Sequence, residues 1–277
     1  MVETPRLLIA CQRDDWEDLP ALVRLFPLGV EVGDFADPDV LEGDWQRRLE
    51  ELRPRLEALP GPRALHGPRS DLNPGLRDRG LVAFCRERYR RALEVAAALG
   101  ASVAVFHTGF NPLIRAPGFE RRWLQRSADF WRGLGEEASP FGITVLLENV
   151  WEPQPQILRD LVDAVDLPTV RACLDIGHAN IYSRQPAGEW LSALGDRVVY
   201  VHLHNNDGRM DTHASLERGT VDYARILPLL LLSPQPPALV LEVSGGRQER
   251  QESLLYLRRL LGFGSEGAKW SVTRPGS

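Results

Sequence analysis

The chain has 277 residues, of which 43% are hydrophobic and 26% charged, and its formal net charge is −5. This composition excludes a disordered chain, and the acidic balance provides no general attraction to nucleic acid. No apolar run approaches the roughly 20 residues of a membrane span, and the first residues, MVETPRLLIA, do not resemble a signal peptide. We therefore expect a cytoplasmic protein without a membrane partner.

Short apolar runs alternate with longer amphipathic segments along the whole sequence. The runs predict strands over residues 6–11, 28–33, 62–66, 102–107, 142–149, 169–176, 197–204 and 237–243. The segments predict helices over about 15–25, 43–58, 76–99, 118–138, 154–165, 187–194, 221–232 and 248–261. Strict alternation implies parallel strands joined by helices, and eight even units favour a closed (β/α)₈ TIM barrel over a doubly wound sheet. We expect a single α/β barrel domain over residues 1–262 and a loosely ordered tail over 263–277.

The segment 76–99 is the clearest predicted helix. Its apolar face is formed by Leu81, Phe84, Tyr89, Leu93 and Ala96. Gly100 follows as a C-cap, because glycine adopts the left-handed conformation that commonly ends a helix.

The segment 118–138 mixes arginines with the aromatic residues Trp123, Phe130 and Trp131. An outer helix whose aromatic side chains pack inward explains this pattern better than a nucleic-acid surface does. Two of the three cysteines, Cys11 and Cys173, lie within apolar runs and are predicted to be buried free thiols, as expected in a reducing compartment.

Six of the predicted strands carry an imidazole or a carboxylate at their carboxyl end or within two residues of it. These residues are His66, His107, Glu148, Asp175, His202 and Glu242. The carboxyl ends of barrel strands all open onto one face, so side chains distant in sequence converge there. Three further potential ligands, His178, Asp211 and His213, follow in the connecting segments. Oxygen and imidazole donors together suit Zn²⁺ or Mn²⁺, so this face is predicted to bind a divalent metal ion.

Local spacing refines the roles of several of these residues. Gly177 is predicted to allow a tight turn that brings His178 back over the barrel mouth, although Asp175 capping the next helix is the simpler alternative. His202 and His204 are two apart in a strand and share a face, which favours His202 as the ligand and His204 as a substrate contact or a support for a ligand. The sequence GFGSEG at 262–267 follows no strand and is not a dinucleotide-binding loop.

The segments HGPRSDLNP, FHTGFNP, LLEN, LDIGHAN, VHLHNNDG, DTH and LVLEVS resemble the xylose-isomerase-like TIM-barrel superfamily, over about residues 6–262. This superfamily includes endonuclease IV and many sugar isomerases and epimerases. The resemblance to the isomerases and epimerases implies one divalent cation held by Glu148, Asp175, His202 and Glu242. It also implies that Glu148 and Glu242 move a proton through an enediolate, and that Asn149 and His204 contact the substrate.

Endonuclease IV provides the main alternative, because its three-zinc pattern maps onto all nine predicted ligands. Cleavage of the phosphodiester bond at abasic sites in DNA is therefore the alternative function. Two features favour a small ligand over DNA. The loop GDFADPDVLEGD has no Lys or Arg and carries five acidic residues: Asp34, Asp37, Asp39, Glu42 and Asp44. The segment SLERG at 215–219 departs from the SLGEG of that family. A barrel that binds metal and sugar without turnover is a third possibility.

The sequence thus predicts a divalent-metal-dependent isomerase or epimerase of carbohydrate metabolism, with a small sugar or sugar phosphate as substrate. One zinc or manganese ion is expected for an isomerase, and up to three for an enzyme of the endonuclease IV type. His66, His107, His178, Asp211 and His213 are expected to be additional ligands or substrate contacts. Neither the sugar nor the oligomeric state follows from the sequence.

Overall fold

The computed structural model describes residues 6–59, 61–69 and 71–262, and its eight strands form a closed barrel. The strands are β1 (Leu7–Cys11), β2 (Gly29–Val32), β3 (Arg63–His66), β4 (Val103–His107), β5 (Thr144–Glu148), β6 (Val170–Asp175), β7 (Val198–Leu203) and β8 (Ala238–Leu241). Each strand pairs in parallel with the next along the chain, and β8 pairs with β1. The predicted (β/α)₈ barrel is confirmed. The predicted tail, with most of the GFGSEG segment, lies outside the described residues.

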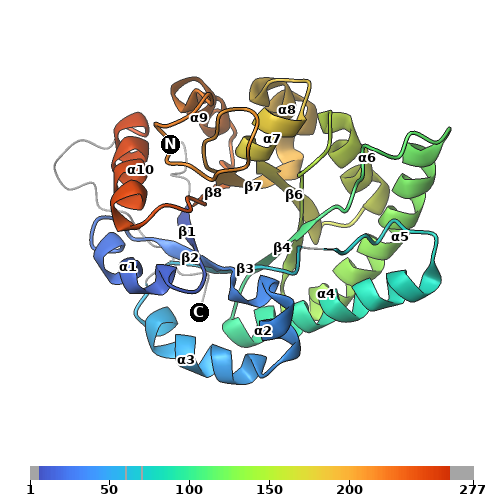
Figure 1. The fold of residues 1–277 in the computed structure, drawn as a ribbon, viewed down its shortest axis with the longest axis horizontal. Helices are drawn as coiled ribbons and strands as arrows, with labels where there is room; N and C mark the ends of the chain where they lie inside the picture. The colour runs from blue at the N-terminus through green and yellow to red at the C-terminus, as the bar shows by residue number, and fades with distance from the viewer. Residues whose placement is uncertain (1–5, 60, 70, 263–277) are drawn as a thin grey trace.

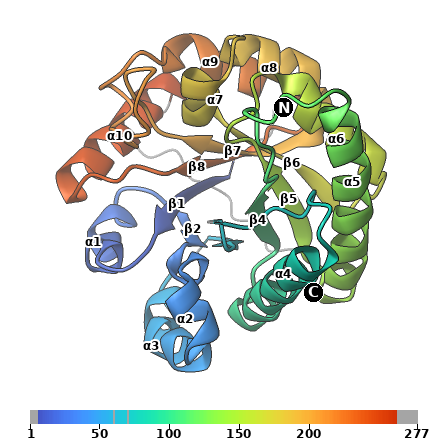
Figure 2. The same ribbon diagram turned by 45° about the vertical axis from the view of Figure 1, so that its right-hand side comes forward.

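Helices surround the barrel in chain order (Figures 1 and 2). They are α1 (Asp15–Leu22), α2 (Pro38–Glu42), α3 (Trp45–Glu57), α4 (Arg79–Leu99), α5 (Phe119–Ala138), α6 (Pro155–Val165), α7 (Ile176–Tyr182), α8 (Ala187–Leu194), α9 (Tyr223–Leu231) and α10 (Arg247–Leu260). Two short helices, α2 and α7, were not expected, because segments of five and seven residues are too short to show a helical period. Within the described ranges, no helix is both long and apolar enough to span a membrane.

Helix α4 ends as predicted but packs differently at its start. Gly100 has φ 69° and caps the helix. Leu81 and Phe84, predicted on the buried face, are 53% and 50% exposed. The buried residues of α4 begin at Cys85, so the helix contacts the barrel only through its later turns. In α5, by contrast, the three aromatic residues are buried as predicted.

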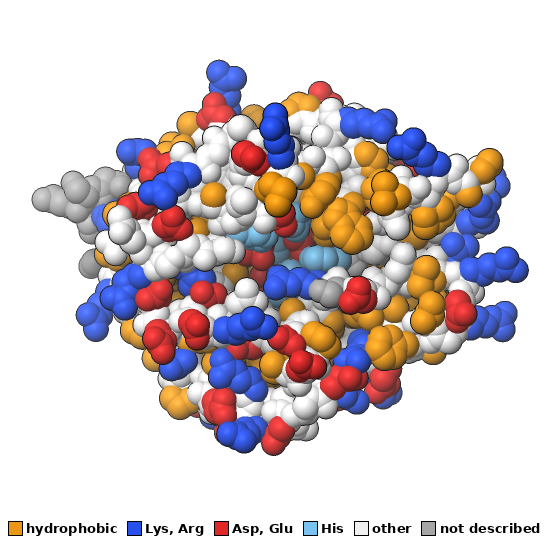
Figure 3. All heavy atoms as spheres, viewed as in Figure 1, with side chains coloured by type: hydrophobic (Ala, Val, Ile, Leu, Met, Phe, Trp, Pro, Cys, Tyr) orange, Lys and Arg blue, Asp and Glu red, His pale blue; other side chains and the backbone are white. Residues whose placement is uncertain are grey.

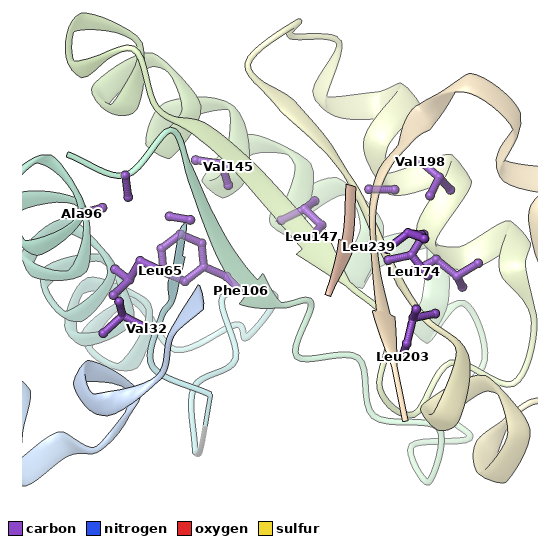
Figure 4. Packing of buried hydrophobic residues seen from close by; sticks show 14 of the residues in the cluster. Val32, Leu65, Ala96, Phe106, Val145, Leu147, Leu174, Val198, Leu203 and Leu239 are labelled. Atoms are coloured by element: carbon purple, nitrogen blue, oxygen red, sulfur yellow. The ribbon is translucent and has the colours of Figure 1, made fainter. Parts of the chain in front are cut away.

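The core has two parts because strand side chains alternate between the two faces of the barrel wall. Outward-facing residues pack against the helices. Figure 4 shows Phe106 and Leu65 together on the side of α4, which carries Ala96. Inward-facing residues form a smaller apolar layer inside the barrel: Leu8, Ala64, Val105, Leu146, Cys173, Tyr200, Ala238 and Val240. Cys11 and Cys173 are buried free thiols, as predicted.

Candidate metal centre

The predicted ligands lie directly above the inner apolar layer. Each strand-end ligand follows a residue of that layer by two positions and therefore points to the same inward face, as His107 follows Val105 and Glu148 follows Leu146. The strand register also makes neighbours of His107 and Glu148, and of Asp175 and His202. Figure 3 shows histidine and acidic side chains together at the floor of the hollow in this face. Strand alternation and barrel closure are therefore sufficient to gather them.

Four groups of these side chains present donor atoms that lie within 4.8 Å of one another. The groups are Glu148, Asp175, His202 and Glu242; His66, His107 and Glu148; His178, His204, Asp211 and His213; and Glu31, His66 and His202. All nine predicted ligands belong to these groups. Glu148, His66 and His202 each belong to two of them, and Glu148 is in addition within 3.4 Å of four histidines, His66, His107, His178 and His202.

The group of Glu148, Asp175, His202 and Glu242 is buried except for the partly exposed Glu242. Nδ1 of His202 lies 3.1 Å from Oε1 of Glu148 and 3.1 Å from Oε2 of Glu242. Oδ2 of Asp175 is 3.7 Å away. The side chain of Glu242 is 12% exposed, whereas that of Glu148 is 1% exposed, so Glu242 is the more accessible of the two acids.

Glu31 of β2 is a member of the cluster that sequence reasoning missed. It is buried, and its Oε2 lies 3.1 Å from Nε2 of His202. The sequence does contain an indication of this residue, because Glu31 is a carboxylate between Val30 and Val32 in an otherwise apolar strand. It was overlooked because Glu31 lies inside its strand, whereas the predicted ligands were sought at strand ends.

Backbone carbonyls orient three of the histidines. Nδ1 of His66 donates to the carbonyl of Gly67 at 3.0 Å, and Nδ1 of His178 donates to that of Asn149 at 3.0 Å. Nδ1 of His213 donates in the same way to the carbonyl of Glu242, also at 3.0 Å. Because a carbonyl only accepts hydrogen bonds, the proton lies on Nδ1 and the Nε2 lone pair is left free in a neutral ring.

Those Nε2 atoms face carboxylates. The distances are 3.2 Å from His66 to Glu148, 3.2 Å from His178 to Asp211 and 3.4 Å from His213 to Asp211. A lone pair and a carboxylate repel each other unless a proton or a metal cation lies between them. The geometry is therefore that of imidazoles whose outer nitrogen is anchored and whose inner nitrogen can bind a cation.

Carboxylate oxygens that lack a hydrogen-bond donor also indicate a cation-binding site. Among the described residues, Oε1 of Glu31, Oε2 of Glu148 and Oε2 of Glu242 are buried without a hydrogen-bond donor. A buried carboxylate oxygen without a partner is costly, and a coordinated cation removes that cost. Mixed imidazole and carboxylate donors suit zinc or manganese. The residues present thus fit a divalent cation.

The charges of the cluster in the absence of metal follow from this geometry. Burial opposes the charged form of His178, but the charge of Asp175 and a hydrogen bond to Asp211 raise its pKa well above 6.5. Burial likewise opposes ionisation of Glu148, but the charges of His202 and His107 hold its pKa well below 4.5. In the absence of metal, Glu148 is thus ionised, and the raised pKa values of His178 and His202 favour their protonated forms. A divalent cation can take the place of those protons.

His204 and Asn149 do not occupy the positions expected of substrate contacts. His204 is fully buried, with Nε2 3.1 Å from Asp175, and its ring stacks on that of His213 at 3.8 Å. Asn149 exchanges two hydrogen bonds of 2.9 Å with the backbone of Asp175. Both side chains are engaged with Asp175, so we interpret them as supports that orient this ligand.

The predicted tight turn at Gly177 is wrong. Asp175 caps α7 by accepting a hydrogen bond from the His178 N–H at 2.7 Å, and Gly177 lies inside that helix. A Cβ atom at Gly177 would lie 2.1 Å from the His204 ring. Glycine is therefore needed for close packing against His204. The helix still brings His178 into the cluster.

The loop after β2 is less acidic in effect than its sequence suggests. Asp34 is buried and paired with Arg48 at 2.6 Å, Asp37 pairs with Arg13 at 2.7 Å, and Glu42 pairs with Arg88 at 2.6 Å. These arginines come from other segments, so the sequence of the loop alone could not reveal the pairing. Three of the five acids are thus neutralised, which weakens the argument from this loop against a nucleic-acid ligand.

The second sequence argument concerned SLERG at 215–219. Glu217 pairs with Arg259 at 3.0 Å and Arg218 with Glu249 at 2.9 Å. All four side chains are substantially exposed, and neither Glu217 nor Arg218 belongs to a donor group. The departure from the endonuclease IV pattern thus stands, because Arg218 occupies the acidic position of that pattern and pairs with Glu249.

The cluster opens into a cavity of about 570 Å³. Besides the ligands, its lining includes three arginines, Arg13, Arg69 and Arg250, and two aromatic residues, Trp151 and Tyr182. A cavity of this size accommodates a small organic substrate. Figure 3 shows basic side chains beside the histidines at its rim.

Residues 28–260 match the sequence model of the family described as xylose isomerase-like TIM barrel. The TTHB071 protein from Thermus thermophilus, whose crystals were soaked with ZnCl₂, is 31% identical with a TM-score of 0.77, and the match covers 94% of this chain and 99% of that chain. A D-tagatose 3-epimerase-like protein is 22% identical with a TM-score of 0.75, covering 92% and 97%, which shows a common fold.

The Methanocaldococcus jannaschii protein MJ1311 is 30% identical over 190 residues, 66% of this chain and 63% of its own length. The match thus spans less than two thirds of this relative.

Proposed function

The chain belongs to the xylose isomerase-like TIM-barrel family, and from this premise we propose that it is a divalent-metal-dependent isomerase or epimerase of a sugar or sugar phosphate. One observation carries the proposal. Glu148 and Glu242 each have an oxygen 3.1 Å from Nδ1 of His202, and each has one buried oxygen without a hydrogen-bond donor in the described structure. Two such carboxylates at the floor of a cavity suit proton removal and return.

The residues divide into supports and reacting groups. Glu148, Asp175, His202 and Glu242 would hold the cation, which would polarise the carbonyl of the substrate. One of the two glutamates takes the proton from the carbon beside the carbonyl, and the other returns a proton to the resulting enediolate. Glu31 holds His202, while Asn149 and His204 hold Asp175. Trp151 and Tyr182 line the wall of the cavity.

A second candidate function is hydrolysis of the phosphodiester bond at abasic sites in DNA. The observation that favours it is the completeness of the other donor groups, of His66, His107 and Glu148, and of His178, Asp211 and His213. Under this alternative they would hold two further cations. Under the isomerase proposal, the five residues other than Glu148 (His66, His107, His178, Asp211 and His213) are extra ligands or contacts to the hydroxyl groups of the sugar.

Exchange of solvent hydrogen tests the proposal directly. The protein, loaded with Zn²⁺ or Mn²⁺, is incubated in D₂O with ketoses, aldoses and their phosphates, and deuterium in the sugar carbon skeleton is measured by NMR. We expect exchange with a subset of them, lowered at least a hundredfold by Glu242→Gln and unchanged by Glu57→Gln, an exposed control on α3.

The same preparations are tested for nicking of duplex DNA that contains an abasic site. Nicking without exchange into any sugar would replace the isomerase proposal by the hydrolase. Metal and sugar binding without either activity would indicate a non-catalytic barrel.

A further inference from the structure

Arg250 is a buried arginine with a free donor at the cavity wall. Its side chain is 3% exposed, its Nε donates to the carbonyl of Val243 at 3.1 Å, and its Nη2 pairs with Asp15 at 2.5 Å. Within the described part of the chain, Nη1 is buried without any acceptor. A buried guanidinium N–H without an acceptor is costly, so an acceptor from a bound ligand would satisfy it.

Arg69 is a second arginine with unused donors on the same cavity. It follows His66 by three residues and is half-buried. Its one hydrogen bond is a long one, from Nη2 to Oε1 of Gln12 at 3.4 Å, and it makes no ion pair with any described residue. Arg48 and Arg88, which are also partly buried, each pair with a carboxylate. An arginine left unpaired beside a metal cluster is available to an anion.

Both arginines contact the residues that follow β1. Arg69 contacts the side chain of Gln12. The backbone N–H of Gln12 donates to Oδ2 of Asp15 at 3.0 Å, and Oδ1 of Asp15 accepts from Arg250. Asp15 is thus neutralised by Arg250, and Gln12, the residue after β1, links Asp15 to Arg69 along the wall of the same cavity.

We propose that Arg69 and Arg250 bind a phosphoryl group of the substrate above the end of β1, so that the substrate is a sugar phosphate and not a neutral sugar. This inference rests on the proposed function and specifies its substrate class. Guanidinium groups match phosphate oxygens in geometry and charge, and phosphate sites in barrels of this kind commonly lie near the loops after the seventh and eighth strands. Arg250 lies in the first turn of the helix that follows β8.

The other charges around the site are compatible with an anion. Of the carboxylates that line this side of the cavity, Asp15 is paired with Arg250, and Glu31 and Glu242 belong to the metal-binding groups. Asp14 is exposed, and the exposed Arg13 next to it pairs with Asp37. Above β1 the phosphoryl group therefore meets donors, while the carbons of the sugar extend toward Glu148 and Glu242 across the same cavity.

Binding of inorganic phosphate to the purified protein tests the subsite without requiring turnover. Isothermal titration is carried out on the wild type, Arg69→Gln, Arg250→Lys and the control Arg225→Gln, which removes an exposed arginine on the outer helix α9. We expect Arg69→Gln to weaken phosphate binding tenfold to a hundredfold, and Arg225→Gln to leave it unchanged. Arg250→Lys keeps the charge but removes the guanidinium group, with its Nη1 donor and its bond to the carbonyl of Val243, and we expect it to weaken binding roughly tenfold. Circular dichroism verifies that each variant is folded.

The outcomes separate this inference from the proposed function. Phosphate binding that depends on Arg69, without deuterium exchange into any sugar, supports the subsite while the isomerase proposal fails. Exchange that is equally fast with neutral and phosphorylated sugars, and insensitive to Arg69→Gln, overturns the subsite while the isomerase proposal stands. Competition with phosphate by an abasic oligonucleotide, but by no sugar phosphate, would overturn the substrate class and assign Arg69 to a phosphodiester backbone.

Discussion

Oε2 of Glu31 lies 3.1 Å from Nε2 of His202, whereas Nδ1 of the same ring faces Glu148 and Glu242. The carboxylate accepts the Nε2 proton, which leaves the Nδ1 lone pair directed at Glu148 and Glu242. A carboxylate that holds the outer nitrogen of a metal-binding histidine selects its tautomer and increases its basicity. Glu31 is therefore a positioning residue for the proposed centre.

Replacing Glu31 by Gln should weaken metal binding by about tenfold to a hundredfold, because the amide can no longer hold the Nε2 proton as strongly. The dissociation constant for Zn²⁺ is measured by competition with a fluorescent chelator. Glu57→Gln serves as an exposed control and should bind as the wild type does. Equal affinities of Glu31→Gln and the wild type would show that His202 does not need this partner.

Metal content should depend on the Glu148 group more than on the His213 group. We expect about one tightly held ion per chain, reduced to almost none in Glu148→Gln and unchanged in His213→Gln, because Glu148 belongs to two donor groups and His213 to one. Elemental analysis by mass spectrometry measures this content. About three tightly held ions per chain, with one lost in His213→Gln, would instead favour the phosphodiesterase.

The stability of the metal-free protein should fall as the pH rises from 6.5 to 9. Burial opposes the charged form of His213, but hydrogen bonding to Asp211 and the charge of Glu242 raise its pKa from 6.5 to about 9. A raised pKa stabilises the fold fully below pH 6.5, and this contribution disappears as the pH rises through about 9. We expect a loss on the order of 2 kcal/mol from this residue.

Urea unfolding in the presence of a chelator, at pH 6 and pH 9.5, measures that loss. His213→Gln should remove this part of the pH dependence, while other titrating groups affect both proteins equally. If the unfolding free energy of both proteins decreased equally between pH 6 and pH 9.5, the His213 imidazolium would not contribute to stability.

Gly177→Ala should destabilise the protein by about 1–3 kcal/mol, because the new methyl group overlaps the His204 ring. The displaced ring would also release Asp175, so metal affinity should fall as well. Gly188→Ala is the matched control, since a Cβ there meets its nearest atom, Cδ1 of Leu229, at 3.7 Å. It should change stability by less than about 1 kcal/mol, in the stabilising direction. Thermal unfolding and zinc competition measure both effects, and equal melting temperatures for the two variants would contradict the packing argument.

Much of this architecture follows from local sequence pattern. All eight predicted strands are present within two residues of their expected bounds, because apolar runs between amphipathic segments have few other ways to bury their side chains. The helix face at Leu81 and Phe84 was mispredicted, since periodicity identifies an apolar stripe but not how far the barrel wall extends beneath it.

Sequence pattern was sufficient to predict the barrel and the face on which the strand-end ligands meet, because both depend on strand alternation and on the common direction of parallel strands. The pairing of the charges became visible only in the folded structure. Arg48 and Arg88 neutralise the β2 loop, Glu31 orients His202, and Arg69 and Arg250 keep free donors above β1. These relationships join segments far apart in the chain, and they depend on side-chain directions that are set only when the barrel closes.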